Sequence, residues 1–183
     1  MTKRKETIIQ AFREDIYDLE EIIGFMPWIE RNEKLLAKKA VFILNTHKSL
    51  STEGFALAVA EEFVVVLLVS FFALICHTLL LYLIWLGGLV AFALHLVVHI
   101  LQAIWLRRYI PALATSILCL PVCSIIIWKT SILLHINTVE LLFFSLIGIL
   151  IVISNLFFAL WLGKQFSKWV NKIFYNPEKI EKL

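Results

Sequence analysis

The sequence predicts an all-α integral membrane protein with about four transmembrane helices and an amphipathic helical region before them. Of its 183 residues, 61% are hydrophobic and 17% are charged, whereas about 45–50% of the residues of a soluble domain are apolar. The apolar residues are concentrated between Gly54 and Gly163. The acidic and basic residues inside that stretch are Glu61, Glu62, Arg107, Arg108, Lys129 and Glu140. A stretch so long and so poor in charge is typical of several membrane spans rather than of a soluble core.

Residues 1–53 are expected to form amphipathic helices at the cytoplasmic face. Apolar residues recur at helical spacing over residues 6–23, but the charges among them are too many for a span, so we expect an interfacial or partner-packed helix. Gly24 is expected to cap this helix and Pro27 to stop it. A second polar helix is expected from about Trp28 to Ile43. Ser51 or Thr52 then suits the N-cap of the first span.

The membrane domain is expected to cover residues 54–163, followed by a basic cytoplasmic tail at 164–183. Its spans are predicted at 54–76, 79–106, 111–128 and 139–163. The break between the first two is placed by length, because one run from Gly54 to Leu106 is far too long to cross the bilayer once.

The basic residues then predict the orientation of the spans. All of them except Lys129 fall on one side of the membrane, and the positive-inside rule makes that side cytoplasmic. We therefore expect a multi-pass protein of the cell membrane with both termini in the cytoplasm and the lipid bilayer as its main partner. Since topology accounts for the basic residues, we expect no nucleic-acid partner.

Polar residues within the spans are candidate functional residues, because an ionisable side chain there costs about 2.5–3.5 kcal/mol. Glu61 and Glu62 lie about 10 Å into the first span, at a rise of 1.5 Å per residue. His95 and His99 are four residues apart and so share one face of the second span. His99 lies about 12 Å from the cytoplasmic end of that span. Glu20 and Glu21 precede the first span and border the same leaflet.

Two imidazoles facing carboxylates suit a divalent metal ion such as Zn²⁺, which can activate water for hydrolysis. We take as candidate ligands His95, His99, Glu20, Glu21 and Glu62. We take as candidate acid–base residues Glu20, Glu21, Glu61 and Glu62. The alternative is structural pairing or proton handling, in which the histidines and acids hydrogen-bond one another.

These residues resemble the HXXEE-domain family of small bacterial polytopic membrane proteins, over roughly residues 15–128. In "YDLEEI", Tyr17 stands where the family motif has histidine, followed by Glu20 and Glu21. In "HLVVH", His95 takes the place of the family's asparagine and His99 that of its histidine. "RRYIPALAT" keeps Pro111 of a Pro-Gly step and has Ala112 in place of the glycine.

The resemblance implies a membrane protein with metal-dependent chemistry, or an inactive relative of such an enzyme. A phenol with a pKa near 10 is a poor metal ligand at pH 7, so Tyr17 cannot replace the imidazole of the motif. His95 can supply an imidazole from another helix.

Two functions remain open. The first is a metal-dependent hydrolase that acts on a lipid or a peptide at the inner leaflet. The second is a non-catalytic accessory, immunity or partner-binding protein, with another membrane protein as its partner. An ion or proton carrier ranks last, because Thr78 and Tyr82 are the only polar residues between His77 and His95.

Overall fold

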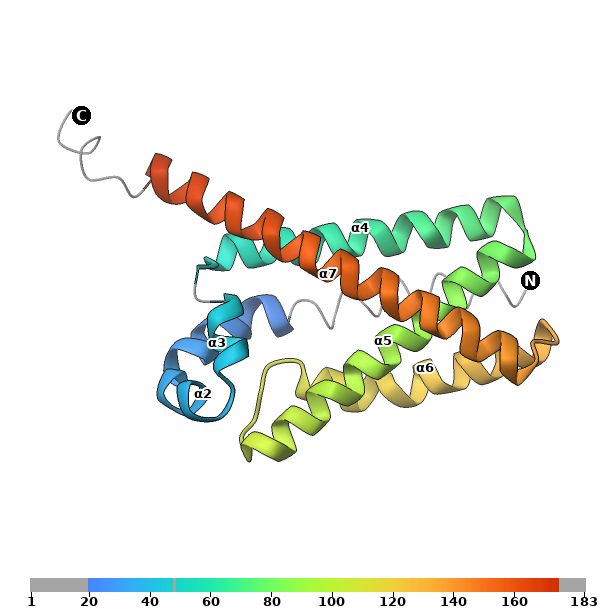
Figure 1. Cartoon of the computed structure of the whole chain (residues 1–183), viewed down its shortest axis with the longest axis horizontal. Helices are drawn as coiled ribbons and strands as arrows, with labels where there is room; N and C mark the ends of the chain where they lie inside the picture. Colours follow the sequence, from blue (N-terminus) through green and yellow to red (C-terminus); the bar gives the residue numbers. More distant parts are fainter. Residues whose placement is uncertain (1–19, 48, 175–183) are drawn as a thin grey trace.

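The computed structural model describes residues 20–47 and 49–174, and Tyr17, the start of the first amphipathic helix and the end of the basic tail lie outside them. Within the described residues every regular element is a helix, as predicted. Residues 20–31 form a helix, the N-terminal helix. The elements that follow are α2 (Glu33–Lys39), α3 (Val41–His47), α4 (Thr52–Cys76), α5 (Leu79–Leu106), α6 (Leu113–Leu133) and α7 (Thr138–Phe174) (Figure 1).

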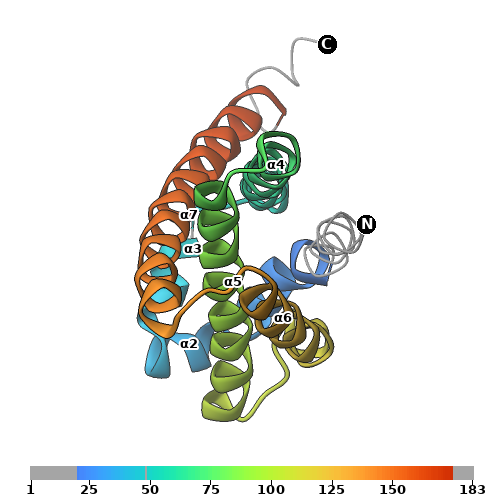
Figure 2. The same ribbon diagram turned by 90° about the vertical axis from the view of Figure 1, so that its right-hand side faces the viewer.

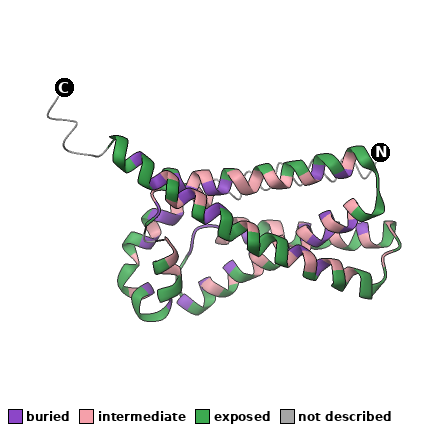
Figure 3. Cartoon of the chain, turned by 45° about the horizontal axis from the view of Figure 1, so that its top comes forward, coloured by how far each residue is buried: buried purple, intermediate pink, exposed green. Residues whose placement is uncertain are grey.

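The four helices α4 to α7 are long and apolar enough to cross a membrane. Their outward faces carry large exposed apolar side chains, such as Phe71, Leu101, Leu118 and Leu146, and exposed positions run along every one of these helices (Figure 3). A surface of this kind is stable in lipid and not in water. The predicted membrane fold is therefore confirmed.

Successive spans run in alternating directions, and α5 lies at the centre of the bundle (Figures 1 and 2). It contacts α4, α6 and α7, while α7 lies across both α4 and α5. Residues 20–31, α2 and α3 gather at the end of the bundle where α4 begins and α5 ends (Figure 1). Phe25, Ile29 and Leu36 are buried there in one apolar cluster with Phe55 and Leu106.

Two pairs of glycines let α7 approach its neighbours closely. A Cβ atom on Gly87 or on Gly148 would overlap backbone atoms of the opposite helix, which marks the crossing of α5 and α7. Gly54 and Gly163 face each other in the same way where α4 crosses α7. Small residues at such contacts favour helix association in membranes, because the backbones can then pack directly against each other.

The break between the first two spans lies where the sequence places it. Helix α4 ends at Cys76 and α5 starts at Leu79. Ser51 caps α4, as expected, because its Oγ accepts a hydrogen bond of 3.2 Å from the Gly54 N–H.

The last two long helices are longer than the spans predicted within them. Helix α6 runs to Leu133 rather than residue 128, since Lys129 near its end is tolerated within the last turns. Helix α7 starts at Thr138 and continues past residue 163 to Phe174. The first part of the predicted tail is therefore helical, because Ala159, Gly163, Ser167 and Val170 continue a buried face beyond the apolar run.

The expected helix break at Gly24 and Pro27 is wrong, because residues 20–31 are helical through both positions. A Cβ atom on Gly24 would lie 3.1 Å from the Pro111 side chain, so this glycine serves a close contact and not a helix end. The expected second helix from Trp28 to Ile43 is instead divided into α2 and α3 at Ala40, whose φ of −142° leaves the helical range.

Candidate metal centre

The histidines of α5 and one glutamate of the N-terminal helix converge inside the bundle. Atoms of Glu21, His95 and His99 that can ligate a metal all lie within 4.8 Å of one another. His99 is buried, with 5% of its surface exposed, and the other two side chains are half-buried. The sequence prediction that His95 and His99 share one helical face toward acidic side chains agrees with this arrangement.

The two imidazoles are already close to the separation that a shared ion requires. Their Nε2 atoms lie 2.9 Å apart, the distance of a hydrogen bond between a protonated and an unprotonated ring nitrogen. Two ring nitrogens bound to one tetrahedral Zn²⁺ at about 2.0–2.1 Å would lie about 3.3 Å apart. The two nitrogens would have to move apart by only a few tenths of an ångström to share an ion, while the proton between them is lost and both rings turn toward the ion.

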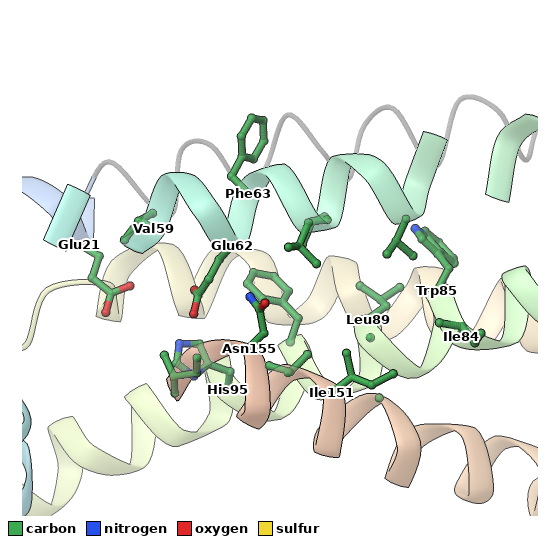
Figure 4. A pocket seen from close by; sticks show the side chains of 18 residues that line it. Glu21, Val59, Glu62, Phe63, Ile84, Trp85, Leu89, His95, Ile151 and Asn155 are labelled. Carbon is green, nitrogen blue, oxygen red and sulfur yellow. The ribbon is translucent and has the colours of Figure 1, made fainter. Parts of the chain in front are cut away.

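Glu61 and Glu62 point to different neighbours although they are adjacent in the chain. Glu62 lines a cavity together with Glu21 and His95 (Figure 4). Glu61 instead accepts a hydrogen bond of 3.2 Å from the Asn155 Nδ2 of α7. Neighbouring side chains on an α-helix are turned by about 100° about its axis, so only one of the two can face the metal centre.

Glu20 is outside the group of three ligand residues and holds the N-terminal helix to the start of α6. Its carboxylate accepts hydrogen bonds from the Tyr109 hydroxyl, from Thr115 Oγ1 at 2.6 Å and from the Thr115 N–H at 3.2 Å. That N–H belongs to the first turn of α6, where a carboxylate satisfies a free donor and interacts well with the helix dipole.

The hydrogen bonds to Glu20 also set its charge. Burial on its own raises the pKa of the Glu20 carboxyl, but the hydrogen bonds from Thr115 and Tyr109 outweigh burial and bring the pKa below its ordinary value. The bond to Glu20 raises the pKa of the Tyr109 hydroxyl. The pair is therefore a carboxylate and a neutral phenol at neutral pH.

The backbone at Ala112 has a conformation that suits glycine, the residue that the resemblance implies at this position. Ala112 is fully buried and precedes α6 with a φ of 74°, in the left-handed region. Glycine adopts that region without strain, whereas a residue with a Cβ atom pays about 1–3 kcal/mol. The turn from Pro111 into α6 also brings Thr115 within reach of Glu20.

A cavity of about 180 Å³ extends from the metal centre between α4, α5 and α7. Its polar lining residues are at one end, and Leu89, Ile84 and Trp85 lie toward the other (Figure 4). The residues that line it are Glu21, Val59, Glu62, Phe63, Val65, Val66, Val69, Ile84, Trp85, Gly88, Leu89, Phe92, His95, Gly148, Ile151, Val152, Asn155 and Leu156.

Asn155 lines the cavity and donates a hydrogen bond to Glu61, although it is not among the predicted site residues. The signal was available, because a side-chain amide in the middle of an apolar span is costly unless it has a polar partner. The cavity itself had no signal, since its walls are ordinary apolar residues.

A family model described as "Protein of unknown function with HXXEE motif" matches residues 16–126, which is more than half of the chain. No match was found among the curated proteins or among the solved structures. The matched region runs from the N-terminal helix to α6 and contains all three residues of the metal centre. The chain therefore belongs to the family of proteins of unknown function with an HXXEE motif.

Proposed function

We propose that the protein is a metal-dependent hydrolase of the cell membrane. The observation that carries this proposal is the convergence of Glu21, His95 and His99, whose ligand atoms lie within 4.8 Å of one another, next to a cavity that Glu21 and His95 line. Two imidazoles and a carboxylate are a common ligand set for catalytic Zn²⁺ and leave a coordination position open.

Glu62 is the acid–base residue in this proposal. An ion held by the three ligands would supply Lewis acidity that makes water nucleophilic near neutral pH. Glu62, in the same cavity, would take the proton as the water oxygen bonds to the acyl carbon. It would return that proton to the leaving group as the bond to the acyl carbon breaks.

The orientation proposed here has both termini in the cytoplasm. Arg107 and Arg108 follow the end of α5, and Lys164, Lys168 and Lys172 lie in the last part of α7, at the same end of the bundle. Lys129 lies near the C-terminal end of α6, at the other end of the bundle. By the positive-inside rule, the metal centre then lies in the cytoplasmic half of the membrane.

Adjacent glutamates provide a matched test of metal binding. The purified wild-type protein is expected to hold about one divalent ion per chain after incubation with Zn²⁺. Glu21→Gln and His99→Ala are expected to weaken binding by more than the roughly 10–100-fold typical of lost outer-shell contacts. Glu20→Gln should keep the ion. Loss of binding in Glu20→Gln but not in Glu21→Gln would contradict the assignment.

The second glutamate pair tests catalysis in the same way. Glu62→Gln should lower the kcat of the metal-loaded protein on chromogenic acyl esters by about 10²–10⁴-fold, because a general base is lost. Its metal content should be unchanged. Glu61→Gln removes a charge one residue away and should retain most of the activity. Absence of hydrolysis by the metal-loaded wild type would refute the hydrolase proposal.

A second candidate is a non-catalytic relative that docks another membrane protein, and Tyr17 is the observation that favours it. The HXXEE motif of the family begins with histidine, and this chain has Tyr17 three residues before Glu20. If Tyr17 has inactivated the site, Tyr17→His should increase metal affinity and create hydrolytic activity that the wild type lacks. If His95 already supplies the missing imidazole, the wild type should be active and the variant should gain little.

A further inference from the structure

The polarity of the cavity changes in the same direction along all three helices that form it. The polar lining residues are Glu62 on α4, His95 on α5 and Asn155 on α7, and Glu21 joins them from the N-terminal helix. Farther along the same helices the lining is apolar, with Val69 on α4 and Ile84 on α5. The cavity thus has one polar end, at the candidate metal centre, and a long, mainly apolar remainder that ends at Trp85, whose buried Nε1–H has no hydrogen-bond partner in the described part of the chain.

Its length along α5 suits an extended chain. His95 and Trp85 both line the cavity and are ten residues apart, which corresponds to about 15 Å along the helix. Trp85 is buried, with 7% of its surface exposed, and lies at the apolar end (Figure 4). An apolar chain that entered from the metal centre would therefore run alongside α5 and reach Trp85.

A peptide does not suit these walls. Each backbone N–H and C=O group that is taken out of water needs a hydrogen-bond partner, and several kcal/mol are lost for each that has none. The lining between Glu62 and Trp85 is almost entirely apolar. A hydrocarbon chain has no such requirement.

We propose that the cavity binds the hydrocarbon chain of a lipid substrate and presents the bond next to that chain's polar end to the metal centre. This inference rests on the proposed hydrolase function for its reacting bond, but the binding of the chain can be tested separately. The cavity would then measure chain length, with Trp85 as the far limit.

Gly88 allows the cavity to be filled without disturbing the helix contacts. A Cβ atom at this position would meet no atom within 4 Å, and the residue lines the cavity. Gly88→Phe should therefore shorten the space available to a chain. Leu94→Phe is the control, because Leu94 lies on the same helix with 47% of its surface exposed.

The experiment uses p-nitrophenyl esters of octanoate, dodecanoate and hexadecanoate with the metal-loaded full-length protein. We expect kcat/KM to depend on chain length, since each methylene that does not fit costs about tenfold or more. Gly88→Phe should move the preference toward octanoate, and Trp85→Leu should move it toward hexadecanoate. Leu94→Phe should leave the profile unchanged. A profile that none of the cavity variants moves would overturn the inference.

A second measurement separates this inference from the proposed function. A diazirine-bearing dodecanoyl probe is expected to label residues of the cavity, and competition by unlabelled chains should follow the same length preference. Length-dependent labelling without any hydrolysis would support the chain site and refute the hydrolase. Hydrolysis without length dependence would support the hydrolase and overturn the chain site. Labelling that all chain lengths compete equally would indicate an ordinary bilayer lipid and would also overturn the inference.

Discussion

At the scale of single residues, each Glu-Glu pair divides its two side chains between different tasks. Glu21 and Glu62 face the cavity, whereas Glu20 binds Tyr109 and Thr115 and Glu61 binds Asn155. The sequence identifies both pairs as candidates because charged residues near or within spans are costly. It does not identify which member faces inward, because that depends on how each helix is rotated against its neighbours.

Ala112 offers a test of backbone strain. Because its φ is 74° and its side chain is fully buried, Ala112→Val should lower the free energy of unfolding by about 2 kcal/mol or more. In Ala112→Gly, relief of strain should offset the loss of one buried methyl, worth about 0.8 kcal/mol. Thermal unfolding in detergent would measure both. Equal stability of the valine variant and the wild type would contradict the left-handed conformation.

His47 predicts a dependence of stability on pH. Burial against Phe25 and Phe55, together with the charge of Lys164, lowers the pKa of His47 from its ordinary value of 6.5. Below pH 6.5 the unfolded chain therefore binds a proton more readily than the folded protein does. The stabilisation by neutral His47 is fully present above that value and is lost as the pH falls below it.

The corresponding measurement is the free energy of unfolding between about pH 7.5 and about pH 5.5. It should fall with pH in the wild type and fall less in His47→Gln. His135→Gln, which removes an exposed histidine at the other end of the bundle, serves as the control. Identical slopes for the wild type and His47→Gln would count against a lowered pKa.

At the scale of elements, hydropathy predicts the four spans because lipid imposes the same requirement on every span. It also places the break between α4 and α5 correctly, since length alone requires one. The ends of α6 and α7 were missed because a helix continues as long as one face finds a partner. The role of Gly24 cannot be predicted for a similar reason, since its contact with Pro111 depends on tertiary packing.

Adjacent glycines in α5 test the crossing with α7. Gly87→Ala should destabilise the protein by about 1–3 kcal/mol, because its Cβ atom would overlap the backbone of α7. Gly88→Ala should be tolerated, since a Cβ atom there meets nothing within 4 Å. Thermal unfolding of the two variants side by side measures the difference. Alanine has a higher helix propensity than glycine, by about 1 kcal/mol, so similar losses of stability in both variants would contradict a close contact specific to Gly87.

At the scale of the whole molecule, the candidate metal centre joins parts of the chain that are far apart in sequence. Glu21 comes from the N-terminal helix and His95 and His99 from the central span. A bound ion should therefore stabilise the folded protein, by about 2.7 kcal/mol when the free ion is at 100 times its Kd. A chelator should lower the unfolding temperature of the wild type and leave Glu21→Gln unaffected. A wild type that is insensitive to chelation would argue against an ion that joins these helices.

The two glycine crossings of α7 also bear on how sharply the proposed hydrolase would discriminate between substrates. Gly148 and Gly163 are 15 residues apart, about 22 Å along the helix, and Ile151, Val152 and Asn155 lie between them and line the cavity. This wall is therefore held at both ends by direct backbone packing and cannot yield to a larger guest as a loop would. Selection would follow a rigid template rather than induced fit, with activity falling steeply, and not gradually, once a chain exceeds the length of the cavity.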